Sequence, residues 1–328
     1  MITSLDMSRD RNAFRLRFIL GTAIAAFSFP AFIFLYGLLG SSFLFFVIVD
    51  VIIAAEGMFI PFLFGAWKLS YLKFVYLIVI FALAEEILVN TPGTISEIGV
   101  GLAFCGLVGF PALGAIVGDR SNSLRIVLEA SGLIFAMRLI LAVLPASVAQ
   151  LGISLPLSYT VLMLVLVSYV TVRSIPLSGT GLFAKGIMPV PIQVLIGLGI
   201  GLGLGLVQYL FLRNTISNIG SISIFGEFYI AVTEVVFIAI TEEFLFRGLL
   251  LNYLNKIMPK WMGINISSLI FAIFHIGYLS PIEVIFAYLI GMAFAYLAVR
   301  TGSLTSPILA HGIGSVVMIV LAQTAFHI

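Results

Sequence analysis

The sequence predicts an all-α protein built as a polytopic membrane helical bundle of about eleven transmembrane helices. The chain has 328 residues, of which 62% are hydrophobic and 9% charged, and its mean hydropathy is +1.24. Soluble domains carry roughly 25% charged residues, so no soluble core accounts for this composition. The spacing of the apolar windows and the placement of lysine and arginine are the second and third observations behind the prediction.

The apolar windows are separated by short polar breaks, and each is long enough to cross a bilayer or nearly so. The first follows four arginines and is too long for a cleaved signal peptide, so we expect it to be retained as a span. The predicted spans lie near residues 18–39, 42–66, 72–89, 99–118, 126–146, 152–172, 191–212, 227–253, 263–279, 282–299 and 303–325.

The basic residues predict the orientation of these spans. With a cytoplasmic N-terminus, 13 of the 16 lysines and arginines fall in inside loops or at inside span ends. Arg213 alone falls outside, and Arg138 and Arg247 lie within spans. Because cytoplasmic loops are enriched in lysine and arginine, this bias favours a cytoplasmic N-terminus and the parity of the span count.

The composition also excludes some classes of function. The basic residues are scattered at span ends and form no groove-binding patch, so we expect no nucleic-acid partner. Cys105 is the only cysteine, which rules out an intrachain disulfide.

Two long connections, residues 172–188 and 213–226, are rich in Gly, Ser and Asn and are predicted to be loops. We place a domain boundary after the first. Residues 1–188 then hold N-terminal transmembrane helices of unknown role, and residues 189–328 hold a charged motif and all three histidines.

Alternating glycines occupy the seventh predicted span, in the run GLGIGLGLGL. No strand and turn precede a helix there, so a phosphate-binding loop is not indicated. Small residues let helices approach closely, and we expect that role. The glycines are Gly197, Gly199, Gly201, Gly203 and Gly205.

The charged motif is TEEFLFRGLL, residues 241–250, within an otherwise apolar span. Ionisable groups inside a membrane are costly and are functional candidates by default. Glu243 and Arg247 are four residues apart on a helix, in the favourable orientation for an ion pair. Glu242 points in a neighbouring direction without a local cation, which suits a general base. A purely structural charge cluster that pins helices together is the alternative interpretation.

Two histidines are predicted to lie at the depth of this motif. From the nearest cytoplasmic span ends, a rise of about 1.5 Å per residue places Glu242, His275 and His311 roughly 15, 18 and 12 Å deep. Three helices would thus present two carboxylates, an arginine and two imidazoles at one level. His327 is the penultimate residue and is uninformative.

These side chains can activate a water molecule. A carboxylate and an imidazole can share its deprotonation, and a second imidazole can donate to the oxyanion of an attacked carbonyl. Glu242, His275 and His311 could instead hold zinc, since two histidines and a glutamate form a known catalytic ligand set. The metal-free arrangement is favoured because the helical HExxH pair is absent.

The motif order resembles a known family. EExxxR in one span, FxxxH in the next and a histidine two spans later are similar to the CAAX-protease and bacteriocin-processing family, which includes the Ras-converting CAAX endopeptidases. The resemblance covers roughly residues 227–325 and implies an all-helical intramembrane endopeptidase, glutamate-dependent although often labelled a metalloprotease. It implies a multi-pass protein of the plasma membrane, with a site opening toward the cytosol and a membrane-anchored or prenylated peptide as substrate.

The resemblance also implies roles for individual residues. Glu242 would activate water together with His275, and Glu243 with Arg247 would be a supporting pair. His311 would serve the oxyanion. The family usually has Asn or Asp four residues after this histidine, where this chain has Ser315. A serine hydroxyl reaches less far than a carboxamide, and a missing oxyanion donor costs about 100- to 1000-fold in rate.

Two other classes of function remain open at this stage. A proton- or ion-coupled transporter is indicated by six further acids within the spans, whereas Ser315 suggests a weakened family member that acts as a scaffold or immunity protein. Transport requires the acids to form a continuous polar path with the C-terminal cluster, and private ion pairs between helices would speak against it. The six acids are Asp50, Glu56, Glu85, Glu86, Glu129 and Glu234.

Overall fold

The structure is a computed structural model, and its described residues form helices joined by turns, with no strand among them. The predicted all-α class is therefore confirmed for this part of the chain. The predicted span at residues 18–39 lies outside the described residues. The described ranges are 43–63, 71–91, 93–118, 121–143, 154–182, 186–212, 224–278 and 280–324.

The N-terminal helices coincide with predicted apolar windows to within a few residues. They are α2 (Phe43–Leu63), α3 (Leu72–Val89), α4 (Ile95–Val117), α5 (Asn122–Val143) and α7 (Ser154–Val172). A short 3₁₀ turn, η2 (Leu177–Thr180), then leads toward α8 (Val190–Leu212).

One uninterrupted helical segment follows, from residue 224 to residue 257, and it carries the charged motif. Its parts are α9 (Ile224–Val232), η3 (Thr233–Ala239), α10 (Ile240–Glu243), η4 (Phe244–Leu251) and α11 (Asn252–Ile257), where η3 and η4 are π-helical. The chain then forms α12 (Lys260–Ile273), the 3₁₀ turn η5 (Ile276–Tyr278), α13 (Pro281–Thr301) and α14 (Thr305–Thr324).

Four helices among the described residues are long and apolar enough to cross a membrane: Ile95–Val117, Val190–Leu210, Pro281–Thr301 and Thr305–Ala322. Large apolar side chains remain exposed along them, such as Ile116 on α4 and Leu195 on α8, as helices that face lipid require. The count of about eleven spans and the cytoplasmic N-terminus stay predictions.

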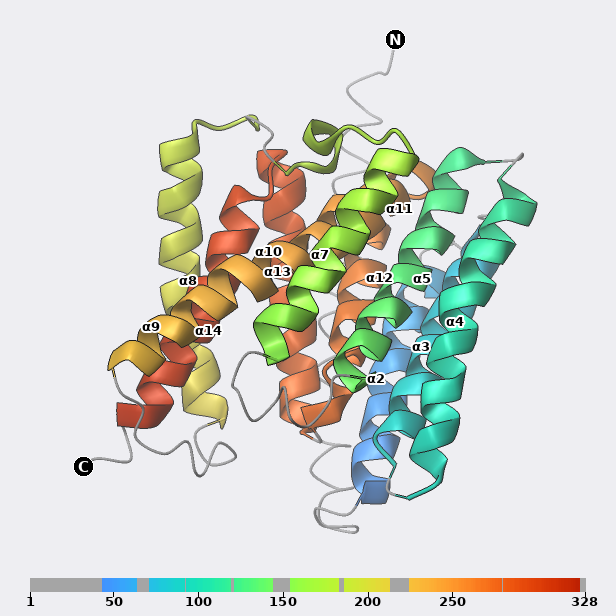
Figure 1. Ribbon diagram of the computed structural model, residues 1–328, viewed down its shortest axis with the longest axis horizontal. Helices are drawn as coiled ribbons and strands as arrows, with labels where there is room; N and C mark the ends of the chain where they lie inside the picture. The colour runs from blue at the N-terminus through green and yellow to red at the C-terminus, as the bar shows by residue number, and fades with distance from the viewer. Residues whose placement is uncertain are drawn as a thin grey trace.

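Neighbouring helices run in alternating directions, so the helix ends that carry lysine or arginine lie at the same end of the bundle. In Figure 1, α7 ends and α8 begins at the upper end of the bundle, where α13 also ends and α14 begins. Outside Arg138 and Arg247, the described lysines and arginines lie near helix ends that belong to this end of the bundle: Lys73, Arg125, Arg173, Lys256, Lys260 and Arg300. We call it the basic end. Which face of the membrane it meets stays a prediction.

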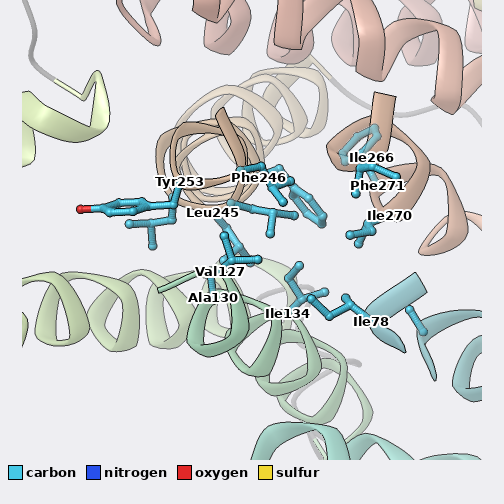
Figure 2. Packing of buried hydrophobic residues seen from close by; sticks show 14 of the residues in the cluster. Ile78, Val127, Ala130, Ile134, Leu245, Phe246, Tyr253, Ile266, Ile270 and Phe271 are labelled. Atoms are coloured by element: carbon cyan, nitrogen blue, oxygen red, sulfur yellow. The ribbon is translucent and has the colours of Figure 1, made fainter. Parts of the chain in front are cut away.

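The apolar core lies between α5, α12 and the central segment 224–257. Figure 2 shows Val127, Ala130 and Ile134 of α5 pointing toward Leu245 and Phe246 of η4. Each of these five side chains is almost fully buried. Because this contact holds η4 on one side and α12 packs on the other, the charged motif is fixed at the centre of the protein.

Glycines allow α8 to lie directly against α14. A methyl group at Gly205 would lie 2.5 Å from the Gly314 carbonyl oxygen and 2.7 Å from Cβ of Val317. Gly197 and Gly201 face α14 in the same way, whereas Gly199 and Gly203 have nothing within 4 Å. The predicted packing role is thus confirmed for every second glycine of the run, those on the helix face turned toward α14.

This contact predicts opposite outcomes for two neighbouring substitutions. Gly205→Ala should destabilise the protein by about 1 to 3 kcal/mol, because the added methyl group overpacks the interface. Gly203→Ala should leave the melting temperature in detergent unchanged or slightly raised, since open space surrounds it. Thermal unfolding of both variants checks this, and equal melting temperatures would contradict the assignment of the two faces.

Candidate active site

The charged motif lies in the most buried part of the chain, where every side chain from Thr241 to Leu251 is buried. The π-helical segments η3 and η4 flank α10, which contains Glu242 and Glu243. A π turn closes through hydrogen bonds five residues apart and occurs often at functional sites. The backbone therefore departs from regular α-helix on both sides of the two carboxylates.

Glu243 joins two helices through one oxygen atom. Its Oε1 accepts a hydrogen bond from Nη1 of Arg247 at 2.8 Å and another from Nδ1 of His311 at 2.9 Å. The Arg247 guanidinium also lies 4.4 Å from the centroid of the Phe271 ring, within cation–π range. The Glu243 and Arg247 side chains are fully buried, and the predicted i, i+4 ion pair between them is present. Because the same Glu243 oxygen binds Nδ1 of His311, the pair also orients that imidazole.

Glu242 is held by two other side chains. Its Oε1 accepts a hydrogen bond from the Tyr159 hydroxyl at 2.6 Å, and its Oε2 lies 3.8 Å from Nε2 of His311. Tyr159 comes from α7, far from the motif in sequence. Glu242 thus has the defined position that a base requires, with one face turned toward a cavity.

His275 lies beyond the end of α12, not inside a helix as predicted. The predicted ninth span extended to residue 279, but α12 ends at Ile273, and the amide of His275 closes a turn onto Ala272. The ring Nδ1 lies 2.9 Å from the Phe271 carbonyl oxygen. A carbonyl oxygen can only accept, so Nδ1 carries the proton and Nε2 is the basic atom of the neutral ring. The FxxxH spacing therefore fixes the tautomer of His275.

These residues surround a cavity of about 460 Å³. Glu242, His275, His311 and Ser315 line it, while Glu243 and Arg247 support its wall from behind. A second cavity of about 340 Å³ shares Tyr159, Glu242, Phe271 and His275 with the first. The structure thus brings the predicted site residues together around Glu242, as their predicted common depth required.

Ser315 lies one turn beyond His311 on α14, and its hydroxyl faces the carboxylate of Glu234 on η3. Glu234 lines the same cavity. Glu234 was predicted only as an acid within a span, and Tyr159 was not predicted as a site residue. Glu234 lies eight residues before Glu242 on the same helical segment, a spacing that could have indicated it, whereas Tyr159 reaches the site through a contact between helices that no local pattern marks.

Three acids of the N-terminal half form ion pairs, whereas Asp50 on α2 is buried and its Oδ1 has no hydrogen-bond partner. Arg138 pairs with Glu86 and lies 3.8 Å from Glu85, and Glu86 also accepts a hydrogen bond from Asn90. These ion pairs join neighbouring helices, and Arg138 and Asn90 also line the second cavity beside Glu242, so the pairs by themselves do not separate these acids from the C-terminal site. The Glu56 side chain lies outside the described part of the structure.

A second group of N-terminal charges surrounds Glu129. This carboxylate binds Arg125 and Arg173 and accepts a hydrogen bond from Tyr169. None of these four residues lines either cavity.

The zinc alternative required Glu242, His275 and His311 as ligands. Among the residues that the structure describes, no three His, Cys, Asp or Glu side chains are arranged to hold a metal ion. Metal-bound histidines commonly engage their second ring nitrogen with a carboxylate or carbonyl oxygen, so the contact of His311 Nδ1 with Glu243 and that of His275 Nδ1 with a carbonyl oxygen are compatible with both arrangements. The metal-free arrangement stays a prediction.

The comparisons with known proteins agree with the motif order. Residues 224–317 match the family model described as type II CAAX prenyl endopeptidase Rce1-like. The comparison with curated proteins gave no match, and neither did the comparison with solved structures. The matched residues contain Glu242, Glu243, Arg247, His275, His311 and Ser315. The predicted resemblance to the CAAX proteases is therefore confirmed over residues 224–317, a segment similar to the Rce1-like family.

Proposed function

We propose that this protein is an intramembrane endopeptidase that cleaves a membrane-anchored or prenylated peptide. The observation that carries the proposal is the position of Glu242, held by Tyr159 and His311 in the wall of a cavity that His275 also lines. The family match suggests a hydrolase of the CAAX type, and the apolar helices suggest a multi-pass membrane protein.

In this mechanism a water molecule lies between Glu242 and the Nε2 atom of His275. Glu242 takes a proton as the water oxygen bonds to the peptide carbonyl carbon, and His275 assists through Nε2. The proton then passes to the leaving amine as the peptide carbon–nitrogen bond breaks. Tyr159 donates to the Glu242 oxygen that faces away from His311 and so turns the other oxygen toward the reacting groups.

His311 is the proposed donor to the oxyanion. Its Nδ1–H group already donates to Glu243, so in this proposal His311 acts as the imidazolium, with protons on both ring nitrogens, and Nε2–H is the donor to the oxyanion. The Glu243 and Arg247 pair holds the ring by that Nδ1 contact and acts as a positioning device. Ser315 adds little to the oxyanion because its hydroxyl faces Glu234.

The proposed setting is the plasma membrane, with cleavage near the cytoplasmic interface, as the resemblance implies. The larger cavity extends from Glu242 away from the basic end, toward the start of α13 and the end of α8. If the basic end is cytoplasmic, the substrate segment beyond the scissile bond would therefore lie deep in the membrane.

Removing the base should abolish turnover. Glu242→Gln should lower kcat at least 100-fold on a panel of farnesylated and membrane-anchored peptides, because general-base catalysis is worth about 10²- to 10⁴-fold. Mass spectrometry of the products measures this, with and without a chelator. Glu97→Gln, on the exposed first turn of α4, is the matched control and should keep full activity.

Two results would contradict this proposal. Turnover that survives Glu242→Gln would remove Glu242 from the mechanism, and turnover that is lost on chelation and restored by zinc would require a metal. Wild-type turnover that disappears in Glu242→Gln would also exclude the scaffold or immunity alternative.

The hydrogen bond from Tyr159 predicts a contribution from the N-terminal half. Tyr159→Phe should lower kcat about 10-fold with little change in KM, since hydrogen bonds to charged groups are worth roughly 1.5 to 3 kcal/mol. Tyr169→Phe is the control, because this tyrosine lies on the same helix and donates to Glu129 away from both cavities. Equal kcat values for the two variants would remove Tyr159 from the site.

Restoring a carboxamide should strengthen the oxyanion site. Ser315→Asn should raise kcat, by as much as about 100-fold if the amide reaches the oxyanion, whereas Ser315→Ala should stay near the wild-type rate. Steady-state kinetics of both variants on the best peptide of the panel measure this. A large loss in Ser315→Ala would show that the serine hydroxyl already has a catalytic role.

A further inference from the structure

The larger cavity has a second polar region, separate from the proposed reaction centre. Gln208 at the end of α8, with Ser280 and Glu283 at the start of α13, lines the cavity at the end of the bundle opposite the basic end. In Figure 1 these helix ends lie at the lower side of the bundle. Neither the ion pair at Glu243 nor the proposed water activation involves these residues.

Glu283 is a buried carboxylate with one unused oxygen. The residue is only 6% exposed, and its Oε1 accepts a hydrogen bond from Nε2 of Gln208 at 3.2 Å. Its Oε2 is buried without a hydrogen-bond partner, although the side chain lines the cavity. The Ser280 hydroxyl accepts from the Glu283 amide at the helix start, which fixes the backbone there. A buried hydrogen-bond acceptor without a donor costs free energy, so a ligand that donates a hydrogen bond to Glu283 would remove this cost.

The charge of the cavity indicates a cationic ligand. Three carboxylates line it, those of Glu234, Glu242 and Glu283, and no lysine or arginine does so among the described residues. Glu234 faces Ser315 and the imidazole of His311, and Glu242 is held by Tyr159. Glu283 has only the neutral amide of Gln208. A positively charged ligand group would therefore gain more interaction free energy at Glu283 than at the other two carboxylates.

The wall between the two polar regions is apolar. Leu204, Ile290 and Met318 line it, together with Ala287 and Ile319. A lysine or arginine side chain matches this arrangement, because its apolar stem could lie along the apolar wall and its charged end could reach the polar region at Glu283. Because Glu242 and Glu283 line one cavity, a peptide at the reaction centre could place such a side chain against Glu283.

We propose that Glu283, held by Gln208, is a specificity determinant that recognises a basic side chain of the substrate. This inference rests on the proposed peptidase function and adds a substrate class to it: peptides with a lysine or arginine near the scissile bond. Glu283 makes its contact away from the reacting atoms, so its effect should appear in the selection among peptides.

A randomised peptide library tests this inference. The positions on both sides of the scissile bond are varied in a membrane-anchored peptide, and the products of the purified protein in phosphatidylcholine nanodiscs are sequenced. We expect lysine and arginine to be enriched at least 10-fold at one position. Glu283→Gln should remove the enrichment while peptides without a basic residue are still cleaved, and Glu283→Lys should favour an acidic residue at the same position.

Controls separate this test from the test of the peptidase function. Glu227→Gln makes the same change on α9, at the same end of the bundle and outside the cavity wall, and should keep the preference. The library is also captured on Glu242→Gln protein, so that the preference is measured without turnover. A melting temperature equal to that of the wild type establishes that each variant is folded.

Several outcomes would overturn the inference. Cleavage or capture without a preference for basic residues would do so, as would a preference that survives Glu283→Gln. Loss of the preference when phosphatidylethanolamine is added would assign the position to the amine of a lipid headgroup. If no peptide is cleaved yet the captured peptides are enriched in basic residues, the peptidase function fails and the recognition site stands.

Discussion

The structure depends on one constraint: a charge buried in an apolar helical bundle must find a partner on its own helix or on a neighbour. Glu243 meets this constraint with Arg247 on its own helical segment and His311 on α14. Arg247 in turn lies against the ring of Phe271 on α12. The positions of three elements are thus coupled to one carboxylate, so the buried ion pair orients the imidazole that the proposed mechanism uses.

Phe271 connects the two imidazoles through different parts of the same residue. Its carbonyl oxygen accepts the Nδ1 proton of His275, while its ring lies edge-on to His311 at a centroid distance of 6.1 Å. The side chain also lies against Phe246 of η4. Any substitution that moves this helix end therefore acts on His275 and on the Arg247 contact together, which makes Phe271 a poor position for testing a single role.

The sequence predicted the features that depend on local spacing. Apolar windows located the described helices, and the i, i+4 spacing identified the Glu243 and Arg247 pair before the helix was known. The common depth of Glu242 and His311 followed from the rise of regular helices. The alternating glycines were assigned correctly to packing, but residues two apart on a helix point about 200° apart, so Gly199 and Gly203 lie on the other side of α8 and face open space.

Contacts between helices that are far apart in the sequence could not be predicted from local spacing. Tyr159 meets Glu242 across 83 residues of sequence, and the amide of Gln208 meets Glu283 across 75. The end of α12 at Ile273 was also missed, because the apolar pattern continues past it. The division of the chain after residue 188 stays a prediction, although Tyr159 comes from the N-terminal side of it and lies against Glu242.

The π-helical segment η4 bears on how relatives of this chain can be compared. A π turn accommodates one residue more than an α turn, so deleting a single residue between Gly248 and Leu251 could leave the helix continuous. Everything after the deletion would then keep nearly its present orientation relative to Glu242, because the π turn absorbs the missing residue, whereas a deletion in the regular α-helix α11 would rotate the residues after it by about 100°. A homologue with every motif letter intact and a one-residue gap after the arginine can therefore retain the site, whereas the same gap in an α-helical turn would move the later residues to another face of the helix.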